Sequence, residues 1–117
     1  MLDLTQLEQA VIASICARLP DLEAAIQGQM ANARVTKREN SGAGFFTTLA
    51  VDPTTPAIDA FHPCSADAEI DGLVHGMGFI LFLDRTGHAD FLEGFTYGEP
   101  DSTVGLDLVN VGFRLKP

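Results

Sequence analysis

The sequence contains no tryptophan, a single tyrosine (Tyr97) and only two cysteines, Cys16 and Cys64, among its 117 residues. Two cysteines are too few for the disulfide framework of a small secreted domain, and their spacing matches no zinc-binding pattern. We expect Cys16 to be a buried helix residue and Cys64 to be a thiol in a loop. The longest apolar run is the eight residues Gly76–Leu83, whereas a membrane-spanning helix needs about 20 residues. No membrane span is therefore predicted.

The first residues also lack the features of a secretory signal. Asp3 stands where such a signal has positive charge, and Thr5, Gln6 and Glu8 interrupt the apolar stretch that it needs. We expect a bacterial, cytoplasmic protein.

Basic residues are scarce, since 7 Lys and Arg stand against 16 Asp and Glu, for a net charge of −9. Phosphate backbones repel such a surface, so nucleic acid is not an expected partner. Arg34, Lys37 and Arg38 fall in one short segment and leave the remaining surface more acidic. Either the charge serves solubility, or the surface docks on a basic partner protein.

A helical rhythm marks the start of the chain. The apolar side chains that recur at its spacing are Leu4, Leu7, Val11, Ile15 and Leu19. They predict a helix over Leu4–Arg18, which Pro20 ends because proline cannot donate to the preceding turn. Asp3 is one candidate N-cap for this helix, and Thr5 with Glu8 is a second. Another helix is predicted to follow near residue 21, with an aspartate as its cap.

From residue 33 the period changes to two, which is typical of strands. The predicted strands cover 33–40, 45–51, 67–74, 76–83, 88–97 and 104–115, with 84–87 as a hairpin turn. Residues 52–66 carry three prolines and predict either a short helical turn near 57–61 or a mobile flap. The predicted fold is a single α+β domain over 1–117, in which two N-terminal helices pack on a five- or six-stranded, mostly antiparallel meander sheet.

Motifs for phosphate, metal or nucleophilic chemistry are weak. Two glycine pairs, at 42 and 44 and at 76 and 78, precede strands rather than the helix that a phosphate loop must open. Potential metal ligands show no strong spacing, and a cysteine–histidine nucleophile would lack an orienting group. The residues considered for these two sites are His62, Cys64, His75, His88, Asp90 and Glu93. We expect no metal and no cofactor, and we assign no catalytic residue.

Glu93 interrupts the otherwise apolar strand segment Phe91–Phe95. It lies either on a solvated face or buried beside a partner such as Arg38, because an unpaired buried charge is costly. If the polar faces of several strands combine, a pocket results. Its candidate ligand-binding residues are Arg38, Glu69, His75, Glu93 and Tyr97.

Phenylalanines populate both faces of the predicted strands. Two short helices cannot cover both faces of a sheet. We therefore expect the remaining apolar surface either to be buried in a homodimer or to form an open groove.

The following residues form a familiar set: Arg38–Glu39 with Gly42–Thr47 (GAGFFT), Gly76–Phe82 (GMGFILF) and Leu92–Tyr97 (LEGFTY). In them the chain resembles a group of small uncharacterised bacterial proteins, and the resemblance extends over residues 20–100. It implies no assigned activity and no catalytic residues. The polar positions it singles out are Arg38, Glu39, Thr47, Glu69, His75, Glu93 and Tyr97.

The expected function is that of a non-catalytic binding or protein-interaction domain, acting as a homodimer or on a partner protein. The alternative is a small enzyme or small-molecule binder whose pocket the five candidate residues line.

Overall fold

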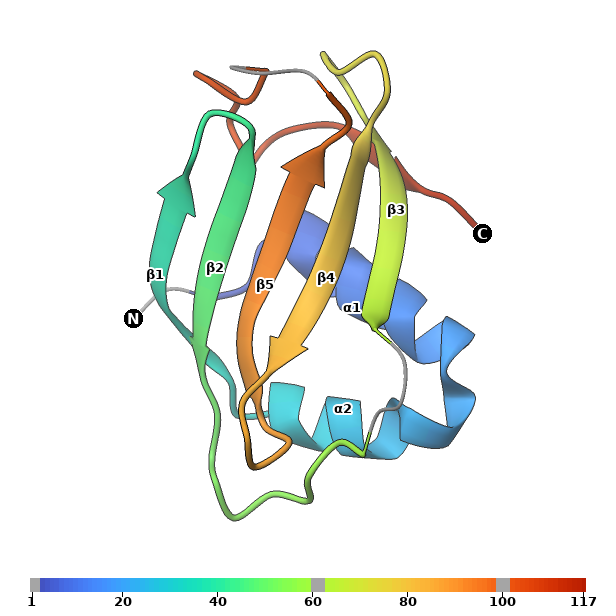
Figure 1. Ribbon diagram of the computed structural model, residues 1–117, viewed down its shortest axis with the longest axis vertical. Helices are drawn as coiled ribbons and strands as arrows, with labels where there is room; N and C mark the ends of the chain where they lie inside the picture. Colours follow the sequence, from blue (N-terminus) through green and yellow to red (C-terminus); the bar gives the residue numbers. More distant parts are fainter. Residues whose placement is uncertain (1–2, 60–62, 99–101) are drawn as a thin grey trace.

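The structure, a computed structural model, describes residues 3–59, 63–98 and 102–117. Helices come first and strands follow: α1 (Gln6–Arg18), the 3-10 turn η1 (Pro20–Leu22), α2 (Glu23–Met30), β1 (Arg34–Asn40), β2 (Gly44–Ala50), β3 (Cys64–Ile70), β4 (Met77–Leu83), β5 (Ala89–Thr96) and β6 (Phe113–Leu115). Figure 1 shows both helices behind the sheet, on the same side of it. The predicted α+β fold with N-terminal helices is confirmed. Within the described part of the chain, no helix is long and apolar enough to cross a membrane.

α1 begins where a reciprocal cap satisfies its first backbone groups. The Thr5 hydroxyl accepts a hydrogen bond from the amide of Glu8 at 3.1 Å, and the Glu8 carboxylate accepts one from the amide of Thr5 at 2.8 Å. The second of the two predicted caps is therefore correct, and Asp3 lies outside the helix. The predicted apolar face is buried, with Leu7, Val11 and Ile15 at its centre.

α2 begins at Glu23 without a capping side chain, so the cap predicted at Asp21 is wrong. Asp21 lies in η1 instead, because Pro20 starts a 3-10 turn there. Tertiary contacts hold this short helix, whose Ile26 and Gln29 are buried.

The six strands form one sheet in the order β1-β2-β5-β4-β3-β6, and every neighbouring pair is antiparallel. The order departs from a simple meander after β2. The chain crosses from β2 to β3 and returns through β4 to β5, which closes the sheet against β2. β5 is therefore an interior strand, with β2 and β1 on one side and β4, β3 and β6 on the other.

β3 runs over Cys64–Ile70, although the sequence predicts a strand over 67–74. The error arises because polar and apolar residues keep alternating past the end of the strand. Gly72 and Gly76 adopt positive φ angles of 93° and 69° and turn the chain into β4. Cys64 is therefore a buried strand residue and not the expected loop thiol, and His75 lies in the turn between β3 and β4.

The last strand is also shorter than predicted, since only Phe113–Leu115 pairs, alongside β3. Residues 102–112 form turns, and Leu106, Leu108 and Val111 pack against the core from that segment. Residues 51–59 contain no helix, and their buried Ile58 is held by a 2.8 Å hydrogen bond from its amide to the carbonyl of Gly87. The rest of the predicted turn at 57–61 extends into residues outside the described part of the chain.

The core lies between the sheet and the two helices. Alternate side chains of each strand point into it, including Thr47 of β2, Leu92 of β5 and Ala66 of β3. The other half of the strand side chains point away from both helices, which leaves one broad face of the sheet without a helix over it.

Candidate functional site

The face of the sheet that no helix covers carries most of the outward aromatic side chains. We call it the open face and define it by side chains of the central strands and by Tyr97, which follows β5. They are Phe46, Thr48, Asp67, Ile80, Phe82, Phe91, Glu93, Phe95 and Tyr97. Buried residues such as Phe45, Thr47, Ala66, Phe79, Leu81 and Leu92 alternate with them along the strands. Strand alternation is thus what places this set on one surface.

Strand register brings the aromatic rings of the open face together. Phe82 of β4 pairs with Phe91 of β5, and their rings stack with centroids 4.6 Å apart and planes at 17°. The ring centroid of Phe46 on β2 lies 6.2 Å from that of Phe91, and the two ring planes meet at 49°. Such ring pairs contribute more stabilising free energy than the burial of their apolar area alone. Phe82 nevertheless stays 37% exposed, so this apolar surface is available to another molecule.

Glu93 stands at the centre of the aromatic side chains. It lies opposite Phe46 on one neighbouring strand and opposite Ile80 on the other. The residue as a whole is partly buried, and none of the residues that the structure describes forms an ion pair or hydrogen bond with its carboxylate. Glu93 is thus a carboxylate with apolar cross-strand neighbours and no counter-charge among the described residues.

A second carboxylate, Asp67, lies at the end of the open face where β4 carries a glycine. It accepts a hydrogen bond from the hydroxyl of Tyr97, and this bond, with partial burial, raises the pKa of Tyr97 to about 12. The ring of Phe95 lies across Gly78, where a Cβ atom would stand 2.4 Å from Cζ of that ring. Gly78 thus makes room for the ring on the neighbouring strand.

Two ion pairs lie at the margins of the open face. Lys37 and Glu39 of β1 are 2.5 Å apart, and Arg114 of β6 is 3.5 Å from Glu69 of β3. All four side chains are at least half exposed, so these pairs contribute little to stability. Lys37 and Arg114 are thus already paired with carboxylates, whereas Glu93 has no ion-pair partner among the described residues.

The five residues predicted to line a ligand pocket do not meet in one place. Glu69, Glu93 and Tyr97 project from the side of the open face, and His75 lies exposed in the turn between β3 and β4. Arg38 points to the opposite, helix-covered side of the sheet. The structure does not bring all five together, because adjacent strand positions alternate between faces and the β3 strand ends before His75.

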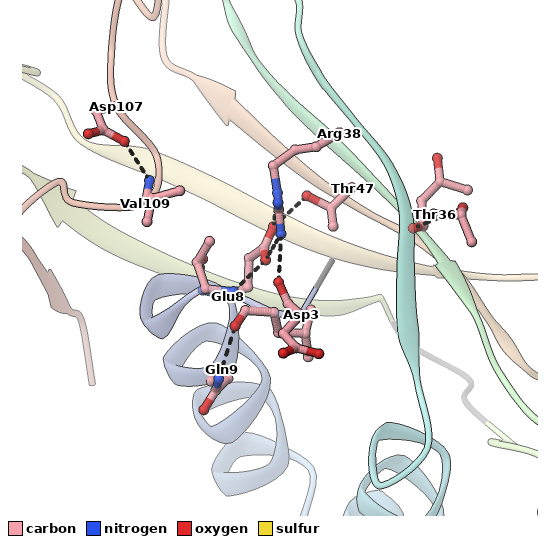
Figure 2. A network of polar contacts seen from close by, with 11 residues as sticks. Asp3, Glu8, Gln9, Thr36, Arg38, Thr47, Asp107 and Val109 are labelled. Carbon is pink, nitrogen blue, oxygen red and sulfur yellow. Dashed lines mark hydrogen bonds and ion pairs between the residues drawn. The ribbon is translucent and has the colours of Figure 1, made fainter. Parts of the chain in front are cut away.

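Arg38 is bound to Glu8 rather than to Glu93, as Figure 2 shows. Its guanidinium donates hydrogen bonds of 2.6 and 3.2 Å to the Glu8 carboxylate, and Thr47 donates a third of 2.6 Å. The amide of Thr5 supplies a fourth. The Glu8 side chain is only 2% exposed, but its oxygens are fully occupied. Its bonds hold α1 against β1 and β2 and leave no capacity for a ligand.

The capping box identifies Glu8 in the sequence, yet its second role as the buried partner of Arg38 is not predicted. A strand arginine and a helix glutamate 30 positions apart have no spacing rule that connects them. The signal that was present is the unusual position of Thr47 within an apolar strand.

Comparison of the chain with known protein families, with curated proteins and with solved structures finds no match. The resemblance noted in the sequence therefore stays a prediction, and the geometry alone carries the functional argument.

The residues considered for a metal site are also dispersed. Cys64 is buried on the helix side, whereas Glu93 is on the open face. His88 bonds to Thr86 and to the carbonyl of Thr55. The described part of the chain holds no group of three His, Cys, Asp or Glu side chains that could bind a metal ion. Burial raises the pKa of the Cys64 thiol, which is the opposite of what a nucleophilic cysteine needs. His62 lies outside the described residues.

A hollow of about 480 Å³ lies on the helix side, between the two helices and the start of β1. Its walls combine apolar side chains such as Ile12 and Met30 with polar ones such as Gln9 and Gln27. None of the five predicted site residues lines it.

Proposed function

We propose that this chain is a non-catalytic protein-interaction domain, acting in the bacterial cytoplasm, whose open face docks a basic partner protein. The observation that carries the proposal is the Glu93 carboxylate, which has no partner among the described residues and lies inside an exposed aromatic surface that neither α1 nor α2 covers. Aromatic side chains are enriched at protein interfaces because they bury a large area with few rotatable bonds.

The charge of the chain favours a basic protein as occupant. A net charge of −9 repels phosphate backbones and attracts cationic surfaces over long range. Within the open face Glu93 adds unmatched charge of the same sign, and two basic side chains at its margins, Lys37 and Arg114, are already paired with Glu39 and Glu69. Steering by the whole chain and recognition at the centre of the face therefore select the same kind of partner.

The proposal is tested by site-specific cross-linking. A photoreactive phenylalanine analogue is placed at Phe82, on the open face, and in a matched control at Gln27, which is exposed on α2. We expect a defined protein to be cross-linked from position 82 in the source cells and not from position 27. The purified partner should then bind the unmodified chain in calorimetry.

The same purified pair gives the decisive comparison. Phe82→Ala should weaken binding by about tenfold or more, as expected of a central interface aromatic, while Gln27→Ala should leave it unchanged. Equal cross-linking from both positions, or an affinity that Phe82→Ala does not alter, would contradict the proposal.

A second copy of the chain is the competing occupant, because the sequence predicts a homodimer. Isologous contact through the open face would bring two acidic surfaces together, so we expect any homodimer to leave this face free. Sedimentation of the unmodified chain and of Phe82→Glu tests the point. A dimer that Phe82→Glu dissociates would replace the partner protein with a self-interface.

A further inference from the structure

The side chain of Glu93 is framed by apolar groups on all four sides within the sheet. Phe91 and Phe95 precede and follow it on the same face of β5. Phe46 and Ile80 stand opposite it on the neighbouring strands. The spacing of strands and of alternate residues places these four within about 5 to 7 Å of Glu93.

The aromatic rings beside Glu93 lean toward other groups instead of closing over it. The Phe91 ring stacks on Phe82, and the Phe95 ring extends across Gly78 toward Tyr97, with its centroid 5.5 Å from that of the tyrosine. Glu93 therefore remains partly exposed among these aromatic side chains.

This combination of one carboxylate with aromatic walls matches a guanidinium group. A guanidinium donates two parallel hydrogen bonds to a carboxylate and stacks its flat faces on aromatic rings. An ammonium is a more strongly hydrated point charge and loses more on entering apolar surroundings. A neutral side chain would leave the carboxylate unpaired.

We propose that Glu93 is the residue by which the open face recognises an arginine side chain of its partner. The inference rests on the proposed function and specifies the chemistry at its centre. The guanidinium lies on the Glu93 carboxylate, beside the rings of Phe46 and Phe91. The surrounding rings exclude water from this contact, while the marginal ion pairs stay hydrated.

Three short peptides test the recognition directly. They share the sequence acetyl-Val-X-Val-amide, in which X is arginine, lysine or citrulline, a neutral side chain of nearly the same shape as arginine. Each is titrated into the isotope-labelled chain while backbone amide resonances are followed. The arginine peptide should shift the resonances of Phe46, Ile80 and Glu93. Citrulline should bind at least about tenfold more weakly, because it lacks the charge-assisted hydrogen bonds, and lysine should be intermediate.

Two isosteric variants distinguish the effect of the Glu93 charge from that of the overall negative charge on this side of the sheet. Glu93→Gln should weaken the arginine peptide by about tenfold or more and remove its advantage over citrulline. Glu69→Gln removes one carboxylate from the same side of the sheet, where Arg114 pairs with it, and should leave binding unchanged. Circular dichroism confirms that both variants fold.

The outcomes separate this inference from the proposed function. Arginine and citrulline peptides that bind equally, an unchanged affinity in Glu93→Gln, or no binding of any peptide would overturn arginine recognition. Docking of a partner protein on the open face is judged independently, by cross-linking from position 82 and by Phe82→Ala. A partner that depends on Phe82 and not on Glu93 would support the interaction domain and refute the role of Glu93.

Discussion

The guanidinium of Arg38 on β1 lies 2.6 Å from the carboxylate of Glu8 on α1, and only 2% of the Glu8 side chain is exposed. This contact joins a helix cap to the edge strand of the sheet. It uses the most buried carboxylate among the described ion pairs, whereas Glu93 on the open face has no ion-pair partner among the described residues. One glutamate therefore stabilises the fold, and we propose the other as the ligand-binding group.

Replacing Glu8 by glutamine should destabilise the fold by about 3 kcal/mol, because it leaves the mostly buried cation of Arg38 without its counter-charge. Urea unfolding measures the effect. The matched control is Glu69→Gln, which removes a carboxylate that is 60% exposed and 3.5 Å from its partner. It should leave the unfolding midpoint unchanged.

A double-mutant cycle with Glu8→Gln and Arg38→Met isolates the pair from other effects of the substitutions. We expect a coupling energy of about 2 kcal/mol, so that the double variant is more stable than the sum of the single losses predicts. Additive losses would show that Glu8 stabilises the protein through its cap alone.

The side-chain amide of Gln29 is fully buried and forms hydrogen bonds with three backbone groups. Its nitrogen donates to the carbonyls of Pro56 and Gly87 at 3.0 and 3.1 Å, and its oxygen accepts from the amide of Ala89 at 2.8 Å. Gln29→Leu should cost about 3 kcal/mol, because these groups would remain buried without partners.

Hydrogen exchange gives a local measurement for the same variant, in which the Ala89 amide should exchange faster. Gln27→Leu, on the exposed side of the same helix, serves as control and should change neither quantity. Normal protection of Ala89 in Gln29→Leu would mean that another acceptor replaces the amide.

Gln29 also shows where prediction from sequence stops. Periodicity predicts both helices and most strand positions because it depends only on neighbours along the chain. The partners of Gln29 lie 27 to 60 positions away, and no local pattern encodes them. The same applies to Thr103, which is fully buried and accepts a hydrogen bond from the amide of Gly44.

The candidate site was predictable in part for the same reason. The position of Glu93 in the apolar segment Phe91–Phe95 identified it from the sequence. The order of the strands decides which residues stand across from it. Since β5 pairs with β2 after a crossover, the contact with Phe46 required the three-dimensional structure.

The two cysteines should be unreactive in the folded chain. Each is 2% exposed, and burial raises the pKa of both thiols, so little thiolate is present near neutral pH. A thiol reagent at pH 8 should label neither cysteine in buffer and both in urea. An added surface cysteine, Gln27→Cys, should react at once and verifies the reagent. Rapid labelling of Cys16 or Cys64 in buffer would contradict their burial.

Tyr97 offers a titration that no other residue obscures, because the chain has one tyrosine and no tryptophan. The hydrogen bond to Asp67, with burial, raises its pKa from an ordinary value near 10 to about 12. Ultraviolet absorbance of the phenolate should therefore rise around pH 12 in the folded chain. A midpoint near the ordinary value would show that the hydroxyl is not bound.

The sign of the associated stability change follows from this direction. A pKa that is higher in the folded state means that folding favours the neutral phenol, so the stabilisation is complete below about pH 10 and is lost as the pH rises toward about 12. Asp67→Ala should move the Tyr97 midpoint down toward its ordinary value and remove this pH dependence. Glu69→Gln, two residues along the same face of β3, should leave the midpoint in place, since its carboxylate contacts Arg114 instead. If both variants shifted the midpoint equally, the cause would be the overall negative charge of the surface and not the hydrogen bond.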